Sequence, residues 1–456
     1  MKKRQFLKHT SRIIGTNLIM PMVACTTHTQ IQSVPARFNW SGNLRYSTDI
    51  LDHPEDSEAL RKIVPNAPNL KVLGTTHSFN SIADSKHRQV TLDKMDPDIR
   101  LDPAQNTVSM NAGVPYGLLA RTLEQQGFAL HNLASLPHIS VAGACATGTH
   151  GSGDSNGNLS TAVTAMRLMR ADGKQVLLSR ENNPEEFKAA VVHLGALGIV
   201  TQISLSVQPT FSVRQYVFEN LPFTELAQNF DAVFSAGYSV SLFTDWQEMR
   251  FNQLWIKKRM DDAGGDSAMP EELFGATAAR DHLHPIKDIA AINCTEQMGL
   301  AGPWHERLPH FKMDFTPSSG EELQSEFFVP REQAVEAIGE LFAMGEAIFP
   351  LLLISEIRSI QKDSLWLSPA YERDSIALHF TWKRDWENVR KLLPRIEDKL
   401  KRFQVRPHWG KLFTLHPGYL REQYERMDDF RAMVKRMDPS GKFLNAFLQK
   451  NLVGKA

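Results

Sequence analysis

The chain has 456 residues, which is more than one hydrophobic core usually supports, so we expect two or three domains. Its apolar content of 42% and charged content of 22% are typical of a globular protein and give no sign of disorder. Lysine plus arginine and aspartate plus glutamate number 51 each, so the chain as a whole does not attract a polyanion and we expect no nucleic-acid partner.

The first 25 residues have the order of a signal peptide. An apolar stretch at residues 13–24 follows five basic residues, and no acidic residue occurs before Asp49. The five basic residues are Lys2, Lys3, Arg4, Lys8 and Arg12. The apolar stretch is too short, and too interrupted by asparagine and proline, to predict an ordinary transmembrane helix. It ends in Met-Val-Ala-Cys25, which resembles a bacterial lipoprotein box. Residues 3–8 resemble a twin-arginine export signal with lysine at the first arginine position.

We therefore expect a signal peptide or lipoprotein signal at residues 1–25 and an exported bacterial protein. It would lie in the periplasm or be anchored to the membrane through a lipidated Cys25. Removal of the five basic residues would leave 46 positive and 51 negative side chains, a net charge of −5. The alternative is an uncleaved basic tail before a buried helix, which would leave the protein in the cytoplasm. With Cys25 acylated, only Cys145 and Cys294 remain, so no disulfide framework is expected.

Short apolar runs alternate with amphipathic stretches in the next part of the chain, which predicts an α/β domain at residues 37–208. We expect helices at 57–63, 116–126 and 184–192, and strands at 70–73, 89–92, 108–111, 163–170, 174–178 and 199–207.

A second domain is expected at residues 209–456. Its first part, 209–340, has a mixed pattern, with a polar interruption at 261–266 that predicts an exposed loop. Beyond it we expect helices at 331–343 and 386–403, strands at 351–360 and 376–382, and a polar turn at 406–411. This order predicts a sheet covered by helices, so the fold class of the chain is α+β.

Two loops rich in small residues predict the binding of one elongated ligand that carries phosphate. The first, Val72-Leu-Gly-Thr-Thr-His77-Ser-Phe-Asn80, leaves an apolar run at a glycine and presents one histidine, which is suited to tether a large cofactor. The second extends over residues 135–153 and has glycines at 143, 148, 151 and 153. Small residues let the backbone approach a ligand closely, and successive amide groups in such turns bind anions.

Each loop also has simpler interpretations. A glycine-rich segment can be a flexible connection, and a single histidine after a strand can be a surface or hydrogen-bonding residue. The dinucleotide fingerprint G-x-G-x-x-G fails, because Asn156 stands where a third glycine is required. His131, His138 and His150 lack the paired spacing of a zinc motif, so no metal site is expected.

Polar side chains share one face of the two strands expected in the second domain. Side chains alternate along a strand, so Glu356 and Arg358 lie on one face of the first strand, as His379 and Thr381 do on the second. The commoner explanation is the solvated face of a two-sided sheet. Against it, two apolar residues of the first strand, Ile354 and Ile360, flank the Glu356 face, which favours the wall of a pocket. Lys411, after an aromatic turn, would add a positive charge or be an ordinary surface lysine.

These segments together resemble the flavoprotein oxidases of the vanillyl-alcohol oxidase type, and within them the sugar-alcohol branch of alditol (xylitol) oxidases. The resemblance covers residues 38–452 and is strongest at 74–80, 135–153, 304–310, 356–358 and 365–371. The stretch His-Trp-Gly-Lys at 408–411 is shared with the related aldonolactone oxidases. The resemblance implies a two-domain flavoprotein with a PCMH-type FAD-binding α/β domain and a C-terminal substrate domain made of a sheet and helices.

The resemblance also implies FAD linked covalently to His77, through the 8α carbon of its isoalloxazine ring. Cofactor contacts are expected from Gly74, Thr75, Thr76, His77, Ser78, Phe79, Ser135, His138, Ser140, Gly143, Cys145, Gly148, Thr149, His150, Gly151 and Ile199. The implied polyol site consists of Ser135, Glu356, Arg358, His379, Thr381 and Lys411, with Glu356, Arg358 and Lys411 as catalytic residues.

The expected reaction is the oxidation of the terminal hydroxyl of an alditol, such as xylitol or sorbitol, to the aldose. Hydride would pass to flavin N5, and oxygen would be reduced to hydrogen peroxide. Our hypothesis is that Arg358 and Lys411 stabilise the developing alkoxide while the other polar residues orient the hydroxyl groups. The alternatives are an aldonolactone oxidase of the gulono or arabinono type, a dehydrogenase with another electron acceptor, and a carbohydrate-binding lipoprotein without the chemistry.

Overall fold

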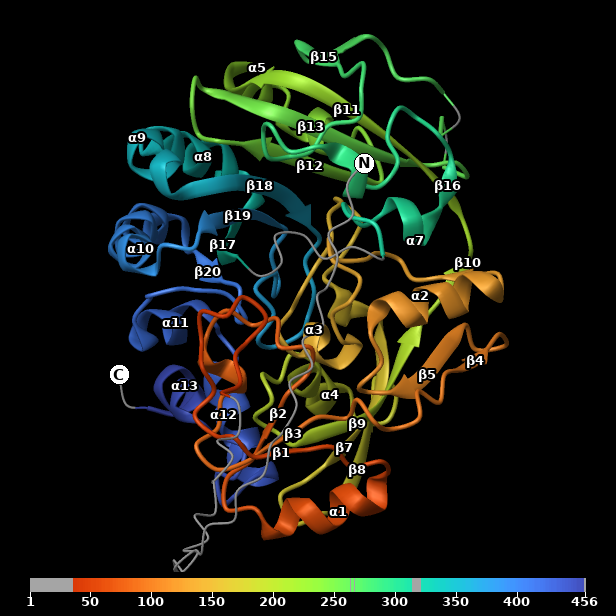
Figure 1. Ribbon diagram of the computed structural model, residues 1–456, viewed down its shortest axis with the longest axis vertical. Helices are drawn as coiled ribbons and strands as arrows, with labels where there is room; N and C mark the ends of the chain where they lie inside the picture. The colour runs from red at the N-terminus through yellow and green to blue at the C-terminus, as the bar shows by residue number, and fades with distance from the viewer. Residues whose placement is uncertain (1–35, 263, 266, 314–320, 455–456) are drawn as a thin grey trace, which may run out of the picture. The chain divides into compact units, whose positions relative to one another are not determined.

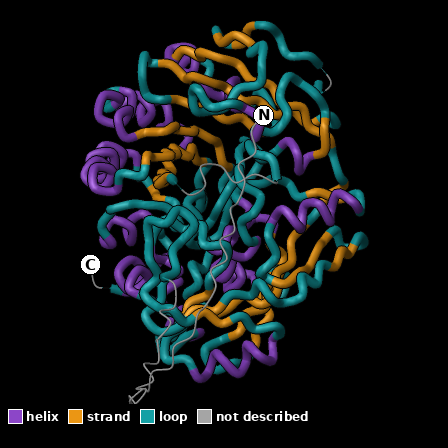
Figure 2. The backbone as a smooth tube through the Cα atoms, in the orientation of Figure 1, coloured by secondary structure: helices purple, strands orange, loops and turns teal. Residues whose placement is uncertain are grey.

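The computed structural model describes residues 36–262, 264–265, 267–313 and 321–454 (Figure 1). The expected export signal at 1–25, with Cys25, lies outside these residues. The strands of the described chain form sheets of three, two, five and ten strands, connected by helices and long loops (Figure 2). No helix in these ranges combines the length and the apolar character needed to cross a membrane.

The first domain contains the smaller sheets. A parallel sheet has the order β1 (Leu51–Asp52), β3 (Gln89–Val90), β2 (Lys71–Val72). An antiparallel sheet has the order β4 (Arg100–Asp102), β5 (Thr107–Asn111), β9 (Ile199–Ser206), β7 (Val163–Met169), β8 (Gln175–Ser179). A separate pair is formed by β6 (Phe128–Ala129) and β10 (Gln208–Pro209).

The helices of this domain are α1 (Ser57–Asn66), α2 (Tyr116–Gln125), α3 (Val141–Ala146) and α4 (Pro184–Val191). Local sequence explains two of the starts. The Asp56 carboxylate accepts a hydrogen bond from Ala59 N at 2.7 Å, and Pro184 occupies the first turn of α4, where its missing N–H costs nothing. The helices and strands expected in this region are confirmed, with ends that differ by at most three residues.

The second glycine-rich segment was expected to be a loop over residues 135–153, but its middle part, residues 141–146, forms helix α3. Small residues allow this helix to pack tightly against the first loop. A Cβ atom added at Gly74 or at Gly143 would lie 2.6 Å from Ser140 Oγ, which is closer than real Cβ atoms come. Both glycines are therefore required where the two loops meet.

The second domain is built on the ten-stranded sheet. Its order is β14 (Glu272–Leu273), β15 (Ala276–Ala278), β11 (Ser212–Pro222), β13 (Arg250–Arg259), β12 (Ser239–Thr244), β18 (Leu352–Ile360), β19 (Ser375–Lys383), β17 (Glu322–Pro330), β20 (Arg406–Pro407), with β16 (Gly302–Pro303) beside β11. Thus much of region 209–340, for which the sequence indicated only a mixed pattern, consists of strands. The strands expected at 351–360 and 376–382 are confirmed as β18 and β19.

Helices cover one face of this sheet (Figure 1). They include α8 (Ala334–Phe342), α9 (Gly345–Ile348) and α10 (Trp386–Leu400), while α5 (Phe223–Gln228), α6 (Phe230–Phe234) and α7 (Trp304–Arg307) lie elsewhere around it. Trp246 connects the layers, because its ring lies 5.1 Å from that of Phe342 in α8 and 5.9 Å from that of Phe380 in β19. Side chains that alternate with Phe380, such as His379 and Thr381, therefore face away from the helices.

The chain finally returns to the first domain. Helices α11 (Pro417–Gln423) and α12 (Met427–Met437) precede α13 (Ala446–Leu448), whose N-cap residue is Asn445. The side-chain amide of Asn445 donates hydrogen bonds to the carbonyls of Ser81, Ile82 and Asp84 at 2.8–3.0 Å. Lys71 Nζ of β2 in turn donates to Phe443 O at 3.2 Å. The last residues thus pack on the first domain, although the sequence analysis assigned 209–456 to the second.

Candidate active site

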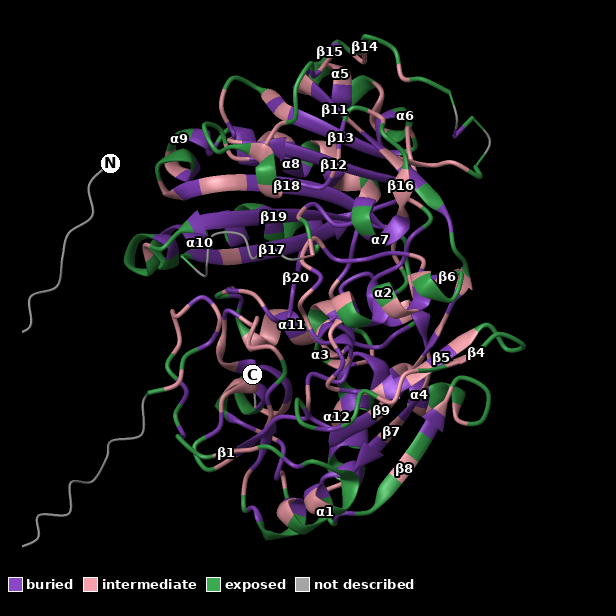
Figure 3. Cartoon of the chain, turned by 45° about the vertical axis from the view of Figure 1, so that its right-hand side comes forward, coloured by how far each residue is buried: buried purple, intermediate pink, exposed green. Residues whose placement is uncertain are grey.

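A cavity of about 620 Å³ lies between the small sheets and the ten-stranded sheet. It is lined by residues within the loops 74–79 and 135–149, the strands β17, β18 and β19, and the turn 408–411. The lining strands are buried along most of their length (Figure 3). The two loops predicted to share a ligand and the polar strand faces predicted to form a pocket wall therefore meet at one cavity.

The loop that carries His77 presents free backbone donors to this cavity. Thr76 has a φ of 63°, in the left-handed region that is uncommon outside glycine, and reverses the direction of the peptide groups around it. Within the described chain, the N–H groups of residues 74–78 donate no hydrogen bond to another residue. A run of unused amides around a left-handed residue can bind a phosphate group.

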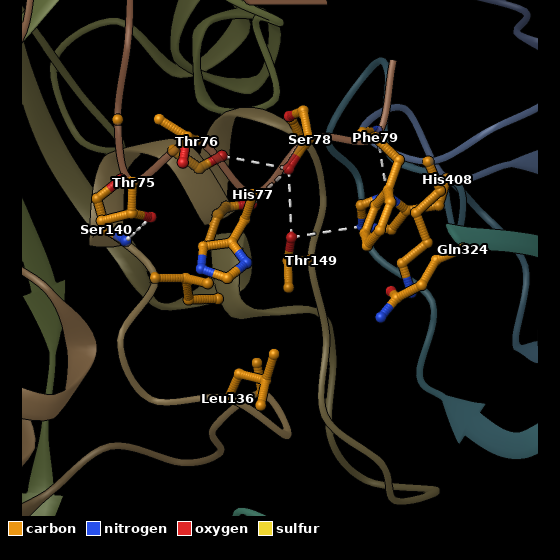
Figure 4. Close-up of a pocket in the computed structure, with 18 of the residues that line it drawn as sticks. Thr75, Thr76, His77, Ser78, Phe79, Leu136, Ser140, Thr149, Gln324 and His408 are labelled. Atoms are coloured by element: carbon orange, nitrogen blue, oxygen red, sulfur yellow. Dashed lines mark hydrogen bonds between the residues drawn. The ribbon is translucent and has the colours of Figure 1, made fainter. Parts of the chain in front are cut away.

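His77 lines the cavity (Figure 4), and its ring also lies beside two other rings. Its imidazole centroid is 4.7 Å from the ring of Trp40 and 4.4 Å from that of His138. Burial, with a smaller contribution from His138, lowers the pKa of His77 to about 3. The imidazole is therefore neutral at physiological pH and retains a nitrogen lone pair.

Hydrogen bonds fasten the His77 loop to the turn that carries Lys411. The Asn80 amide donates to Trp409 O at 2.8 Å and to Lys411 O at 2.7 Å, and Phe79 N donates to Gly410 O at 2.8 Å. On the other side of the turn, His408 Nε2 lies 3.4 Å from Thr149 Oγ1 in the second loop (Figure 4). Hydrogen bonds thus join both loops of small residues, 72–80 and 135–153, to the turn at 408–411 of the second domain.

The register of the large sheet brings the polar side chains together. Glu356 pairs with His379, His379 pairs with Glu326, and Ile354 pairs with Thr381, so these residues share one face. Glu356, Arg358, His379 and Thr381 are all buried. The solvated-face interpretation is therefore wrong, and the interpretation as a pocket wall is confirmed.

Glu326 lies at the centre of this wall. Its carboxylate is 2.8 Å from Lys411 Nζ, 3.0 Å from Arg358 Nη2 and 3.2 Å from His150 Nε2, and its side chain is 1% exposed. Burial by itself would raise the pKa of Glu326, but Lys411, His150 and Arg358 together hold it well below its usual range. A buried carboxylate therefore holds two basic side chains in place.

Glu356 is held in its charged form by a similar balance. Its Oε1 atom lies 2.7 Å from His310 Nε2 and 3.4 Å from Arg358 Nε. Burial acts to raise the pKa of Glu356, but Arg358 and His310 outweigh it and lower that pKa. Burial also lowers the pKa of Lys411, against the attraction of Glu326, and lowers that of His379 well below its usual value.

Two further groups complete the wall. Arg358 Nη1 lies 3.5 Å from Ser135 Oγ and from His150 O, so it reaches from β18 to the second loop. His379 Nε2 is buried and has no hydrogen-bond partner among the described residues. A neutral imidazole nitrogen of this kind is available to a ligand hydroxyl group.

The structure places most of the expected residues at the cavity and several away from it. Those that line it are Gly74, Thr75, Thr76, His77, Ser78, Phe79, Ser135, Ser140, Gly143, Thr149, His150, Glu356, Arg358, His379, Thr381 and Lys411. His138, Cys145, Gly148, Gly151 and Ile199 are not in the lining.

Physical reasons explain these exceptions. The His138 ring packs against that of His77 at an interplanar angle of 54°, and the buried Cys145 thiol lies 3.5 Å from Tyr116 Oη. At Gly148 a Cβ atom would lie 3.0 Å from Pro369, so this glycine serves packing between segments. Gly151 similarly packs against Asn132, and Ile199 is buried within β9.

Sequence reasoning missed Glu326, His310 and Lys257. Lys257 on β13 is buried, and its Nζ lies 3.1 Å from His310 Nδ1. Long polar side chains stand at every second position up to Glu326, so Glu322, Gln324 and Glu326 lie on one face of β17. That alternation could have revealed the strand, but the partners of Glu326 depend on strand order.

These features fit a dinucleotide cofactor of the FAD type. The unused amides of residues 74–78 suit its phosphates, the glycines at 74 and 143 leave room beside Ser140, and neutral His77 lies at the cavity. The polar wall stands on the other side of the same cavity, where a substrate would meet the redox end of the cofactor.

Comparisons with known proteins agree with this arrangement. A family model described as FAD binding domain matches residues 48–179, and one described as D-arabinono-1,4-lactone oxidase matches residues 317–451. Among solved structures, a solvent-stable cholesterol oxidase covers 92% of this chain and 99% of its own, with a TM-score of 0.73 and 14% identity. Cholesterol oxidase from B. sterolicum covers 91% and 96%, with a TM-score of 0.71 and 15% identity. These two show the fold, and they confirm the expected two-domain α+β class.

Sequence relatives identify the family. An L-gulonolactone oxidase of Mus musculus is 26% identical over 446 residues, which are 90% of this chain and 97% of the relative. An L-gulono-1,4-lactone dehydrogenase of Mycobacterium tuberculosis is 26% identical and covers 92% and 99%. An alditol oxidase of a Streptomyces species is 45% identical over 419 residues, which are 91% of this chain and 99% of the relative. The chain therefore belongs to the alditol oxidase family of FAD-dependent oxidoreductases.

Proposed function

We propose that the protein is an alditol oxidase that converts the terminal hydroxyl group of a polyol, such as xylitol or sorbitol, to an aldehyde group. The observation that carries this proposal is the buried polar wall beside the His77 loop. Each hydroxyl of a polyol both donates and accepts a hydrogen bond. The wall offers an acceptor at Glu356 and donors at Arg358 and Lys411, so it matches a chain of hydroxyl groups.

The positive side chains suit the charge that develops in this reaction. FAD, when bound, would accept the hydride from the terminal carbinol carbon while the hydroxyl proton is released, and oxygen would then take up two electrons and two protons to give hydrogen peroxide. Arg358 and Lys411 place preorganised positive charge where the substrate oxygen becomes an alkoxide. His379, which burial keeps neutral, offers its free Nε2 to a substrate hydroxyl. A substrate without hydroxyl groups would leave these buried groups unpaired.

Turnover by flavin-loaded protein tests this proposal. We expect kcat/KM for xylitol or sorbitol to exceed that for L-gulono-1,4-lactone at least about tenfold, measured as hydrogen peroxide formed. Arg358→Met should retain the flavin colour and lose about 10²- to 10³-fold in kcat.

The alternatives give different results. Turnover of the lactone without the polyols would support an aldonolactone oxidase, and polyol turnover with an artificial acceptor but not with oxygen would support a dehydrogenase. A colourless preparation after refolding with FAD would favour a carbohydrate-binding protein. Each of these results contradicts the proposal.

We also infer that His77 carries a covalent bond to the flavin. Its neutral imidazole has a lone pair for bond formation, and its ring lines the cavity in the loop of unused amides. The wild-type band should therefore fluoresce as flavin on a denaturing gel, and the His77→Ala band should not. His138→Ala is the matched control, because it removes the neighbouring imidazole and should leave the fluorescence. Fluorescence of the His77→Ala band would refute the attachment site.

For the location of the protein, we propose export as a lipoprotein acylated at Cys25. The basic residues, the apolar stretch and the Met-Val-Ala-Cys sequence support this proposal. After expression in a bacterial host, the wild-type protein should fractionate with the membrane and Cys25→Ser should not. Recovery of both proteins from the cytoplasm would contradict export.

The role of Glu326 predicts a pH-dependent stability. Glu326→Gln leaves Arg358 and Lys411 without their shared counter-charge, so we expect the free energy of unfolding at pH 7 to fall by about 3–5 kcal/mol. The pKa of Glu326 is lower in the folded state than its unfolded value of about 4.3, so its stabilisation is present above that pH and is lost as the pH falls toward the folded pKa.

The difference in stability between wild type and Glu326→Gln should therefore narrow below about pH 4. Urea unfolding at several pH values measures it. Glu332→Gln, at an exposed position just after the same strand, should differ from wild type by less than about 0.5 kcal/mol. A difference for Glu326→Gln that stays constant on acidification would contradict this role.

A further inference from the structure

A buried lysine and a buried histidine form a chain that ends on Glu356, and the histidine, His310, itself lines the cavity. Lys257 Nζ lies 3.1 Å from His310 Nδ1, and His310 Nε2 lies 2.7 Å from Glu356 Oε1. The three residues are 1%, 4% and 5% exposed. Lys257 and His310 come from β13 and from the segment after α7, so the chain crosses from one edge of the site to the other.

Burial lowers the pKa of Lys257 to about 7, and its contacts favour the charged form and one placement of the protons. Its Nζ is within hydrogen-bond distance of Leu308 O, of Pro309 O at 3.2 Å and of His310 Nδ1. These three acceptors match the three N–H groups of an ammonium ion. His310 Nδ1 is then the acceptor, so the ring proton is on Nε2, where it is donated to Glu356.

The opposite arrangement is unfavourable. A neutral amine would use two N–H groups for the two carbonyls and turn its lone pair to Nδ1–H of His310. His310 Nε2 would then face the Glu356 carboxylate with no proton between two acceptors 2.7 Å apart. Because Glu356 is also beside Arg358, the charged carboxylate is the favoured form.

Aromatic side chains fix the plane of the imidazole. The rings of Trp255 and Phe243 meet His310 edge-on, with centroids 5.2 Å and 5.6 Å away. Trp255 is itself held by a hydrogen bond from its Nε1 to Gln253 Oε1 at 2.7 Å. The ring of His310 therefore has little freedom to rotate and exchange its two nitrogens.

We propose that Lys257 and His310 are positioning residues that keep Glu356 oriented as a hydrogen-bond acceptor for a substrate hydroxyl beyond the reacting end. Neither residue is assigned contact with the reacting atoms. The pair makes the site select longer polyols, which carry a hydroxyl group at this position. A substrate without that hydroxyl leaves the Glu356 carboxylate unpaired. This inference rests on the proposed polyol oxidation and adds a determinant of its specificity.

Two conservative substitutions of His310 give opposite expectations. In His310→Gln the amide nitrogen reaches the position of Nε2 and can still donate to Glu356. In His310→Asn the shorter amide remains near Lys257 and cannot reach Glu356. We expect KM for xylitol to rise about 10- to 100-fold in His310→Asn and to stay within about threefold in His310→Gln, with kcat little changed in both.

Lys257→Met tests the other end of the pair. Without the ammonium, His310 Nδ1 loses its donor and the ring loses one of the two hydrogen bonds that fix it. KM for xylitol should therefore rise, but less than in His310→Asn, because the Glu356 carboxylate still favours the proton on Nε2. His305→Asn is the matched control, because it changes a buried histidine that does not line the cavity. Flavin absorbance and thermal unfolding confirm that each variant is loaded and folded.

A truncated substrate separates positioning from general damage. Butane-1,2-diol keeps the reacting end of a polyol and lacks the hydroxyl groups beyond it. Its KM should be the same within about threefold in wild type, His310→Asn and Lys257→Met. An unchanged KM for xylitol in His310→Asn, or equal losses with both substrates, would overturn the inference.

The tautomer of His310 can be determined without measuring enzyme turnover. The ring ¹⁵N signals of His310, assigned by their loss in His310→Gln, should show a proton on Nε2 and a bare Nδ1. A proton on Nδ1 would overturn the inference even in an active enzyme. A wild-type protein with the Nε2–H tautomer and no polyol turnover would instead contradict the proposed function, so the two failures are distinguishable.

Discussion

The active site depends on the burial of one carboxylate between two cationic side chains. Arg358 and Lys411 come from distant parts of the chain and would repel each other in a medium of low dielectric constant. The Glu326 carboxylate contacts both at 2.8–3.0 Å, and its attraction to each cation offsets the repulsion between them. Strand order supplies this geometry, because Glu326 and Glu356 both lie opposite His379 on the strands that flank it. The site is therefore a product of sheet register as much as of residue type.

Hydrogen bonds connect the two sides of the cavity. The side-chain amide of Asn80 joins the loop of His77 to the turn of Lys411, and Gly153 N donates to Ser359 O at the end of β18. The position of the polar wall is thus tied to that of the two loops through a few hydrogen bonds. This coupling gives a physical reason why residues far apart in sequence act at one reacting carbon.

The sequence predicted the fold class, the regular elements of the first domain and the polar faces of β18 and β19, because these follow from local periodicity. It did not predict β17 as a strand or Glu326 as a site residue. The alternation around Glu326 is short, and its partners are fixed by the pairing of β17 between β19 and β20, which no local pattern encodes. Helix α3 was missed for a different reason, since glycine and alanine there serve close packing rather than flexibility.

The return of the chain to the first domain affects the order in which the molecule is completed. Asn445 donates to carbonyls that precede it by 361–364 residues, and Lys71 donates to the carbonyl of Phe443, which is made much later. During synthesis these contacts form only when nearly the whole chain has left the ribosome. The domain whose residues are made first is thus completed only after the second domain has been made.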